Sequence, residues 1–256
     1  MLTDLAALGL SYFALKISSR PATHEKTYGY LRAEILAALA NGIFLILITA
    51  YIFYEAYERF GSPPKVKSAA MTVIAVTGLI ANLVTARLLY PARQDNLNLR
   101  GAFLHVLGDT LGSVGAILAG ILMMTRQWYL ADPVVSAIVG GLILYGAWKL
   151  VAESVDILLE STPRHLNVSD ILSDLRGMSG VASVHDLHVW SIASEITAMS
   201  CHIVLNSAED AGQALAAASL LMREKYGIEH TTIQMEYENW TSGPGGTVVG
   251  PQFHHG

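Results

Sequence analysis

The sequence is poor in charge and in cysteine. Only 14% of its 256 residues are charged, against about 25% in an ordinary soluble domain. Hydrophobic residues make up 52%, and the mean hydropathy is +0.42. The single cysteine, Cys201, excludes an internal disulfide framework and a multi-cysteine zinc finger. A net charge of −5 gives no reason to expect a nucleic-acid partner. Together these shortages indicate a membrane protein.

The N-terminus also lacks the features of a signal peptide. It carries Asp4 where a signal peptide has lysine or arginine. Residues 5–15 contain no charge, but this run is too short to cross a bilayer by itself. We therefore expect residues 1–18 to form part of a membrane helix.

Four later runs are long and nearly free of charge. A spanning helix needs about 20 mostly apolar residues, so we expect four spanning helices. The runs cover residues 35–54, 68–86, 101–124 and 133–148. Basic residues are more frequent in the first and third connections than in the second and fourth, which predicts that the former face the cytosol. The first and third connections contain seven basic residues: Lys16, Arg20, Lys26, Arg32, Arg87, Arg93 and Arg100. The second and fourth contain four: Arg59, Lys65, Lys67 and Arg126.

The sequence after Glu153 alternates between helical and strand patterns. A capped helix, two β-rich runs with a turn near Ala193, an amphipathic helix and a final strand predict an α+β domain of order αββαβ. A Gly/Pro-rich tail follows, which we expect to be disordered. The predicted domains are therefore a membrane domain over residues 1–152, a cytosolic domain over 153–240 and the tail over 241–256.

Within the run 101–124 the only ionisable side chains are His105 and Asp109. Residues four apart share one face of a helix, and charged groups inside a membrane face a partner, a cavity or an ion path. An imidazole and a carboxylate on one face suit Zn²⁺, which takes four ligands. Asp4 is the only other acid well inside an apolar run. The alternative is that His105 and Asp109 form a structural polar contact.

Small and amide residues in these runs are better explained by helix packing than by chemistry. That interpretation applies to the glycines, and less firmly to Asn41 and Asn82, which could instead line a polar path. The glycines in question are Gly101, Gly108, Gly112, Gly115 and Gly120.

Three segments together resemble the cation diffusion facilitator family of zinc transporters: "TYGYLRAEILAALANG", "DNLNLRGAFLHVLGDTLGSVGAI" and "VHDLHVW" followed by "HTTIQME". The resemblance runs from Met1 to about Glu238. It implies six membrane helices, a remnant of which this chain contains, and a cytosolic metallochaperone-like (ferredoxin-like) αββαβ domain. It also implies a homodimer that exports divalent metal in exchange for protons.

The resemblance assigns His105 and Asp109 to one half of a transport site on the family's fifth helix. The other half maps onto Asp4 and a residue four positions before it, which this sequence does not contain. We therefore expect the chain to be truncated at its N-terminus, with the fourth ligand missing.

For the cytosolic domain, the resemblance implies a second zinc site. By position, the expected ligands are His185, His202 and Glu236, with His230 as a further candidate. His188 is a weaker candidate, because "HVW" is typical of strand packing. Cys201 alternates with His202 and is expected to face the core.

The resulting hypothesis is a multi-pass membrane antiporter, not an enzyme, that exchanges divalent metal for protons. Zinc is the expected substrate and regulatory ion, with cadmium or cobalt as further substrates. The expected partners are a second copy of the chain and membrane lipid. Short loops favour a bacterial cytoplasmic membrane, with the C-terminal domain in the cytosol.

The alternative is a transport-deficient metal sensor or scaffold of the same family. An intramembrane metalloenzyme is disfavoured, because the sequence has no His-Glu-x-x-His motif.

Overall fold

The computed structural model describes all residues except 1, 62–67, 95, 208–209 and 238–256, and it leaves out the side chains of residues 2–7 and 68–74. The predicted disordered tail lies outside the described residues. The chain divides into two compact units, residues 1–155 and residues 156–256. Each unit is described by itself below.

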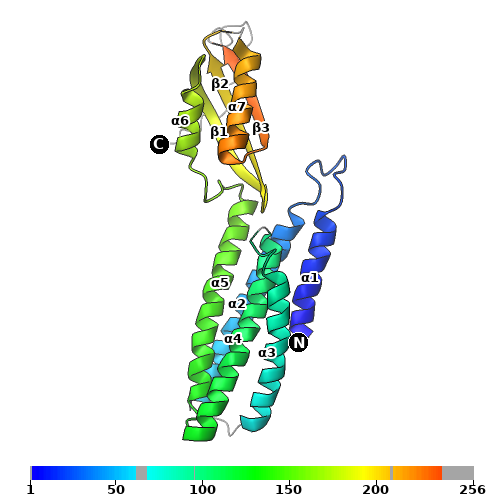
Figure 1. Cartoon of the computed structure of the whole chain (residues 1–256), viewed down its shortest axis with the longest axis vertical. Helices are drawn as coiled ribbons and strands as arrows, with labels where there is room; N and C mark the ends of the chain where they lie inside the picture. The colour runs from blue at the N-terminus through cyan, green and yellow to red at the C-terminus, as the bar shows by residue number, and fades with distance from the viewer. Residues whose placement is uncertain (1, 62–67, 95, 208–209, 238–256) are drawn as a thin grey trace. The chain divides into compact units, whose positions relative to one another are not determined.

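The first unit is helical, as its apolar runs predicted (Figure 1). Among the described residues, three helices are long and apolar enough to cross a membrane, namely α2, α4 and α5. Helix α3 forms where a fourth span was expected, but its described apolar stretch is shorter, from Ala75 to Leu89. The helices are α1 (Leu2–Ser18), α2 (Ala33–Gly61), α3 (Ser68–Leu89), α4 (Leu97–Arg126) and α5 (Ala131–Leu158).

Helix α4 is defined by its caps and packs closely through glycine. The side chain of Asn96 accepts a hydrogen bond from the backbone N–H of Leu99 and so caps the N-terminus. A Cβ at Gly108 would lie 3.1 Å from Ile143, and one at Gly115 would lie 2.6 Å from Val135. These glycines therefore allow α4 and α5 to approach, as predicted.

Gly112 does not fit that interpretation. An added Cβ there would meet nothing within 4 Å, since residue 112 faces open space. The prediction of helix packing was therefore wrong at Gly112.

A buried polar cluster connects α1, α2 and α4. Asn41 Nδ2 donates to Ser11 Oγ over 3.5 Å, and Asn98 Nδ2 donates to the Ser11 carbonyl over 2.8 Å. All three residues are at most 2% exposed. The predicted interhelical role of Asn41 is confirmed, and the contacts set where α1 packs.

The second unit has the predicted order αββαβ. Its sheet has the order β1-β2-β3, with β1 antiparallel to β2 and β2 parallel to β3. Ser194 and Glu195 make the expected turn between β1 and β2. The elements are α6 (Val168–Arg176), β1 (Val181–Ala193), β2 (Ile196–Leu205), α7 (Ala211–Tyr226) and β3 (His230–Tyr237) (Figure 1).

Helices α6 and α7 pack against one face of this sheet. The shared core contains Leu175 from α6, Met222 from α7 and Met199 from β2, each 0% exposed. Cys201 is 1% exposed in the same core, as predicted, and burial raises the pKa of its thiol to about 11. Because strand residues alternate between faces, His202 lies on the face opposite to the helices.

Candidate metal sites

His105 and Asp109 lie one turn apart on α4. His105 Nε2 is 3.7 Å from Asp109 Oδ2, which is longer than a hydrogen bond. The histidine side chain is 4% exposed, whereas the aspartate side chain is 39% exposed. The two groups therefore present a nitrogen and an oxygen ligand in the same direction, the aspartate closer to open space.

Both residues line a cavity of about 880 Å³. Helices α2, α3, α4 and α5 all contribute to its wall. A shared cavity is where an ionisable pair in a membrane segment is expected to lie. Its other polar side chains are Thr49, Glu55, Arg59, Asn82, Ser113, Asp132 and Ser136.

Asn82 is one of the residues whose role the sequence left open. It comes from α3 and lines the cavity together with Asp109. This position fits the polar-path interpretation of Asn82, whereas the favoured interpretation as a packing residue stays a prediction. The reason is how α3 packs against α4. Residue 78 on α3 lies beside Ser113, which is one turn beyond Asp109 on α4. Because the two helices run in opposite directions, residue 82 lies one turn nearer to Asp109.

Asp4 lies in α1, but its side chain is outside the described part of the chain. Its level can still be inferred from the backbone. Ser11 contacts Asn98, and α1 and α4 run in opposite directions (Figure 1). Asp4 is seven residues before Ser11, and His105 is seven residues after Asn98. The two positions are therefore at a similar depth, about 10 Å from the Ser11 contact at 1.5 Å per residue.

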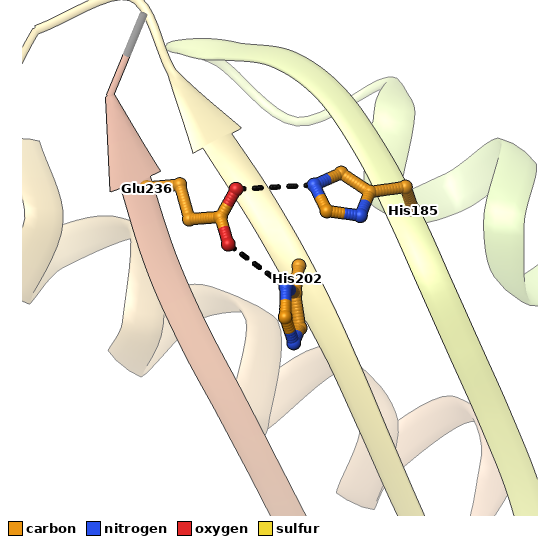
Figure 2. Close-up of side chains that lie close together, drawn as sticks. All are labelled: His185, His202 and Glu236. Atoms are coloured by element: carbon orange, nitrogen blue, oxygen red, sulfur yellow. Dashed lines mark hydrogen bonds and ion pairs between the residues drawn. The ribbon is translucent and has the colours of Figure 1, made fainter. Parts of the chain in front are cut away.

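In the second unit, three predicted ligands converge (Figure 2). Glu236 is shared: its Oε2 lies 3.1 Å from His185 Nε2 and its Oε1 lies 2.8 Å from His202 Nδ1. One ligand atom from each residue lies within 4.8 Å of the others. Two imidazole nitrogens and a carboxylate form a donor set that suits Zn²⁺.

The strand register explains why these residues meet. His185 on β1 is directly opposite His202 on β2, and β2 runs parallel to β3, where Val204 is opposite Glu236. Glu236 is therefore a diagonal neighbour of His202, within reach of a long side chain on the same face.

The surroundings of the Glu236 carboxylate favour its ionised form. Partial burial by itself would raise the pKa of Glu236, but hydrogen bonds with His185 and Gln234 outweigh burial, so that the pKa lies below its ordinary value. Metal ligation requires an ionised carboxylate, and this arrangement favours that form.

Sequence reasoning missed Asp186. It lies in a β-bulge between His185 and His188, with a left-handed φ of 51°. Its Oδ1 is 3.0 Å from His188 Nε2, and its Oδ2 is 3.7 Å from His202 Nε2. The expectation that His188 packs within the strand was wrong, because its side chain is 42% exposed beside Asp186.

The structure separates His230 from this cluster. It begins β3 opposite Ala198, six residues before Glu236. At about 3.3 Å per strand residue the two positions are roughly 20 Å apart. His230 therefore cannot share one metal ion with Glu236.

Comparisons with known proteins match both units. Residues 1–159 match the cation efflux transmembrane domain, and residues 163–238 match the cytoplasmic domain of cation efflux proteins. A cadmium, cobalt and zinc/H(+)-K(+) antiporter of Bacillus subtilis is 44% identical over 246 residues, covering 93% of this chain and 78% of that protein. The zinc transporter ZitB of Escherichia coli is 42% identical over 240 residues, covering 93% and 76%.

Solved structures also match part of the chain. Among them is the metal-bound C-terminal domain of the CzcD transporter from Cupriavidus metallidurans, with 28% identity and a TM-score of 0.27. The match covers 28% of this chain and 99% of that domain.

Proposed function

The chain belongs to the cation efflux family, and from that premise we propose that it exports zinc from the cytoplasm in exchange for protons. One observation carries the proposal: His105 and Asp109 lie on one helix face and line a cavity shared by four helices. The names of relatives support it, since they include a metal/H(+)-K(+) antiporter and zinc transporters.

Exchange follows from competition between protons and metal. A ligating histidine must be neutral and a ligating aspartate ionised, so metal binding displaces protons. An ordinary histidine titrates near pH 6.5, within reach of the pH difference across a membrane. His105 and Asp109, with Asp4 at a similar depth, are the residues that we propose hold the metal and take up protons when it leaves.

The ligand types support zinc as the main substrate. One imidazole with carboxylates suits Zn²⁺, and related divalent ions such as Cd²⁺ and Co²⁺ accept the same donors. A relative named as a cadmium, cobalt and zinc antiporter is consistent with this range.

We further propose that His185, His202 and Glu236 hold a regulatory zinc ion. When bound, that ion would join β1, β2 and β3 through one set of bonds and would stabilise the folded domain. The cluster fits the ion because its three ligand atoms are within 4.8 Å of one another and its carboxylate is ionised. His230 is not part of the proposed site.

The distribution of basic residues supports a cytosolic C-terminal unit. The matched description of residues 163–238 as a cytoplasmic domain agrees with it. We propose a bacterial cytoplasmic membrane, because the relatives named above are bacterial, and a homodimer as the working unit.

The test is zinc flux into proteoliposomes that contain a zinc-sensitive dye, with an imposed pH gradient. We expect the imposed gradient to accelerate zinc uptake by the wild-type protein. The double variant His105→Ala/Asp109→Ala should carry none, and Ser113→Ala, which alters the same cavity, should retain flux. Zinc binding by the wild-type protein without any flux would support the sensor or scaffold alternative instead.

A further inference from the structure

Arg59 joins two acidic residues at one end of the cavity. Its Nη1 donates a hydrogen bond to Asp132 Oδ2 over 2.7 Å, and its Nη2 donates to Glu55 Oε1. Glu55 lies one turn before Arg59 on α2, whereas Asp132 belongs to the first turn of α5. Arg59 therefore links α2 to α5 through two residues that are 73 positions apart in sequence.

These three residues line the same cavity as His105 and Asp109. Their depth follows from the packing of α2 on α4. A Cβ at Gly101 would lie 3.6 Å from Asn41 Nδ2, so these two positions are level, and both helices run in the same direction (Figure 1).

Asp109 is eight residues after Gly101 on α4. On α2, Glu55 is fourteen and Arg59 eighteen residues after Asn41. At 1.5 Å per residue, Glu55 is about 9 Å and Arg59 about 15 Å beyond Asp109. The ion-pair group therefore lies beyond the metal-binding pair, toward the end of the cavity where α2 ends and α5 begins. In the proposed topology that is the extracytoplasmic end.

Charged side chains in a membrane segment are costly unless they are paired or serve an ion path. Arg59, Glu55 and Asp132 satisfy one another, and while they are paired their side chains occupy this end of the cavity. The bridge ties α2 to α5 across this end of the cavity, and its opening would free two carboxylates that attract a cation.

We propose that Arg59 controls passage at the outer end of the cavity, closed while it bridges Glu55 and Asp132. When the bridge opens, Glu55 and Asp132 become the exit-side residues that receive the departing metal ion. The direction and the cargo in this inference rest on the proposed transport function, but the closure itself does not. A purely structural clamp between α2 and α5 is the competing interpretation.

Ser113 offers a position from which to observe closure. It lies one turn beyond Asp109 on α4, lines the cavity, and precedes the level of Arg59. If the ion-pair group closes the outer end of the cavity, a cysteine placed there is shielded from the extracytoplasmic side while the bridge is formed. The native Cys201 contributes little background, because it is 1% exposed and burial raises its pKa to about 11.

The experiment measures labelling of Ser113→Cys in intact cells by a maleimide that cannot cross the membrane. Adding Arg59→Gln should raise the labelling rate about tenfold, and Arg59→Lys, which keeps the charge but lacks the guanidinium fork, should raise it less. Arg126→Gln, an exposed basic residue at the same end of the helices, should leave the rate unchanged. The protein without Ser113→Cys measures the background from Cys201.

A labelling rate in Arg59→Gln equal to that of Arg126→Gln would overturn the proposal and leave a structural clamp. If Arg59→Gln fails to fold, Asp132→Asn provides the same test from the other side of the bridge and should also raise labelling. Zinc flux measured on the same variants separates the two proposals. Arg59-dependent labelling without wild-type flux would refute the proposed transport but not the closure, and flux without Arg59-dependent labelling would refute the closure alone.

Discussion

His185 Nε2 lies 3.1 Å from Glu236 Oε2, although 51 residues separate them in the chain. The contact exists because β2 lies between their strands and carries His202, whose Nδ1 contacts the other oxygen of the same carboxylate. One carboxylate thus bridges two imidazoles on the sheet face away from the helices. This arrangement gives the cytosolic unit a compact donor set.

Zinc should stabilise the cytosolic unit, residues 156–240, studied as an isolated domain. A ligand that binds only the folded state adds about 2.7 kcal/mol to the free energy of unfolding at 100 times its Kd. His202→Ala should remove most of this gain, and His230→Ala, outside the cluster, should retain it. Thermal unfolding with and without zinc measures both. Equal gains in wild type and His202→Ala would show that His202 is not a ligand.

The stability of the same domain should fall in acid partly through Asp174. Hydrogen bonds from Lys225 and Tyr226 lower the pKa of Asp174 below its ordinary value. A lowered folded-state pKa adds stability above the unfolded pKa of about 3.9, and this is lost as the pH falls through the folded-state pKa.

Asp174→Asn should therefore lower stability at pH 7 and reduce the further loss between about pH 5 and 2. Asp170→Asn, an exposed residue on the same helix, is the matched control and should follow the wild-type profile. Urea unfolding across this pH range is the measurement. A wild-type pH profile for Asp174→Asn would refute the linkage.

Two glycines on α4 should respond in opposite directions to alanine. A Cβ at Gly115 would lie 2.6 Å from Val135, so Gly115→Ala should destabilise the membrane unit by about 1–3 kcal/mol. Gly112 has nothing within 4 Å, so Gly112→Ala should be neutral or stabilising by up to about 1 kcal/mol. Thermal unfolding in detergent compares the two. A Gly115→Ala protein as stable as Gly112→Ala would contradict the close approach of α4 and α5.

Replacing His105 by aspartate should alter selectivity without abolishing transport. The change keeps a ligand on the same helix face but substitutes oxygen for nitrogen, which suits harder ions such as Mn²⁺. Flux of zinc, cadmium and manganese should shift toward manganese. Unchanged selectivity would exclude His105 as a ligand.

Much of the fold follows from local patterns in the sequence. The apolar runs predicted α2, α4 and α5, and the four-residue spacing of His105 and Asp109 placed them on one face of α4. Strand alternation correctly assigned Cys201 to the core. These features depend on the period of one element, which the sequence displays directly.

Features that depend on contacts between elements were not predictable in the same way. The ion pair between Arg59 and Asp132 depends on how α2 packs against α5, and no local pattern encodes it. The bulge at Asp186 shifts the register of β1, so His188 leaves the position that simple alternation gave it. Asn82 could be assigned to the cavity only once the rotation of α3 against α4 was known.

The central claim is that Asp109 binds the transported metal and exchanges it for protons. The most direct measurement follows zinc and proton movement simultaneously in proteoliposomes, with a zinc-sensitive dye and a pH-sensitive dye inside. In the wild-type protein and in the Ser113→Ala control, zinc and protons should move in opposite directions with matched time courses. In Asp109→Asn, which keeps the side-chain size but removes the charge, both movements should vanish. Zinc movement in Asp109→Asn at the wild-type rate, or wild-type zinc movement without proton counterflow, would contradict the account.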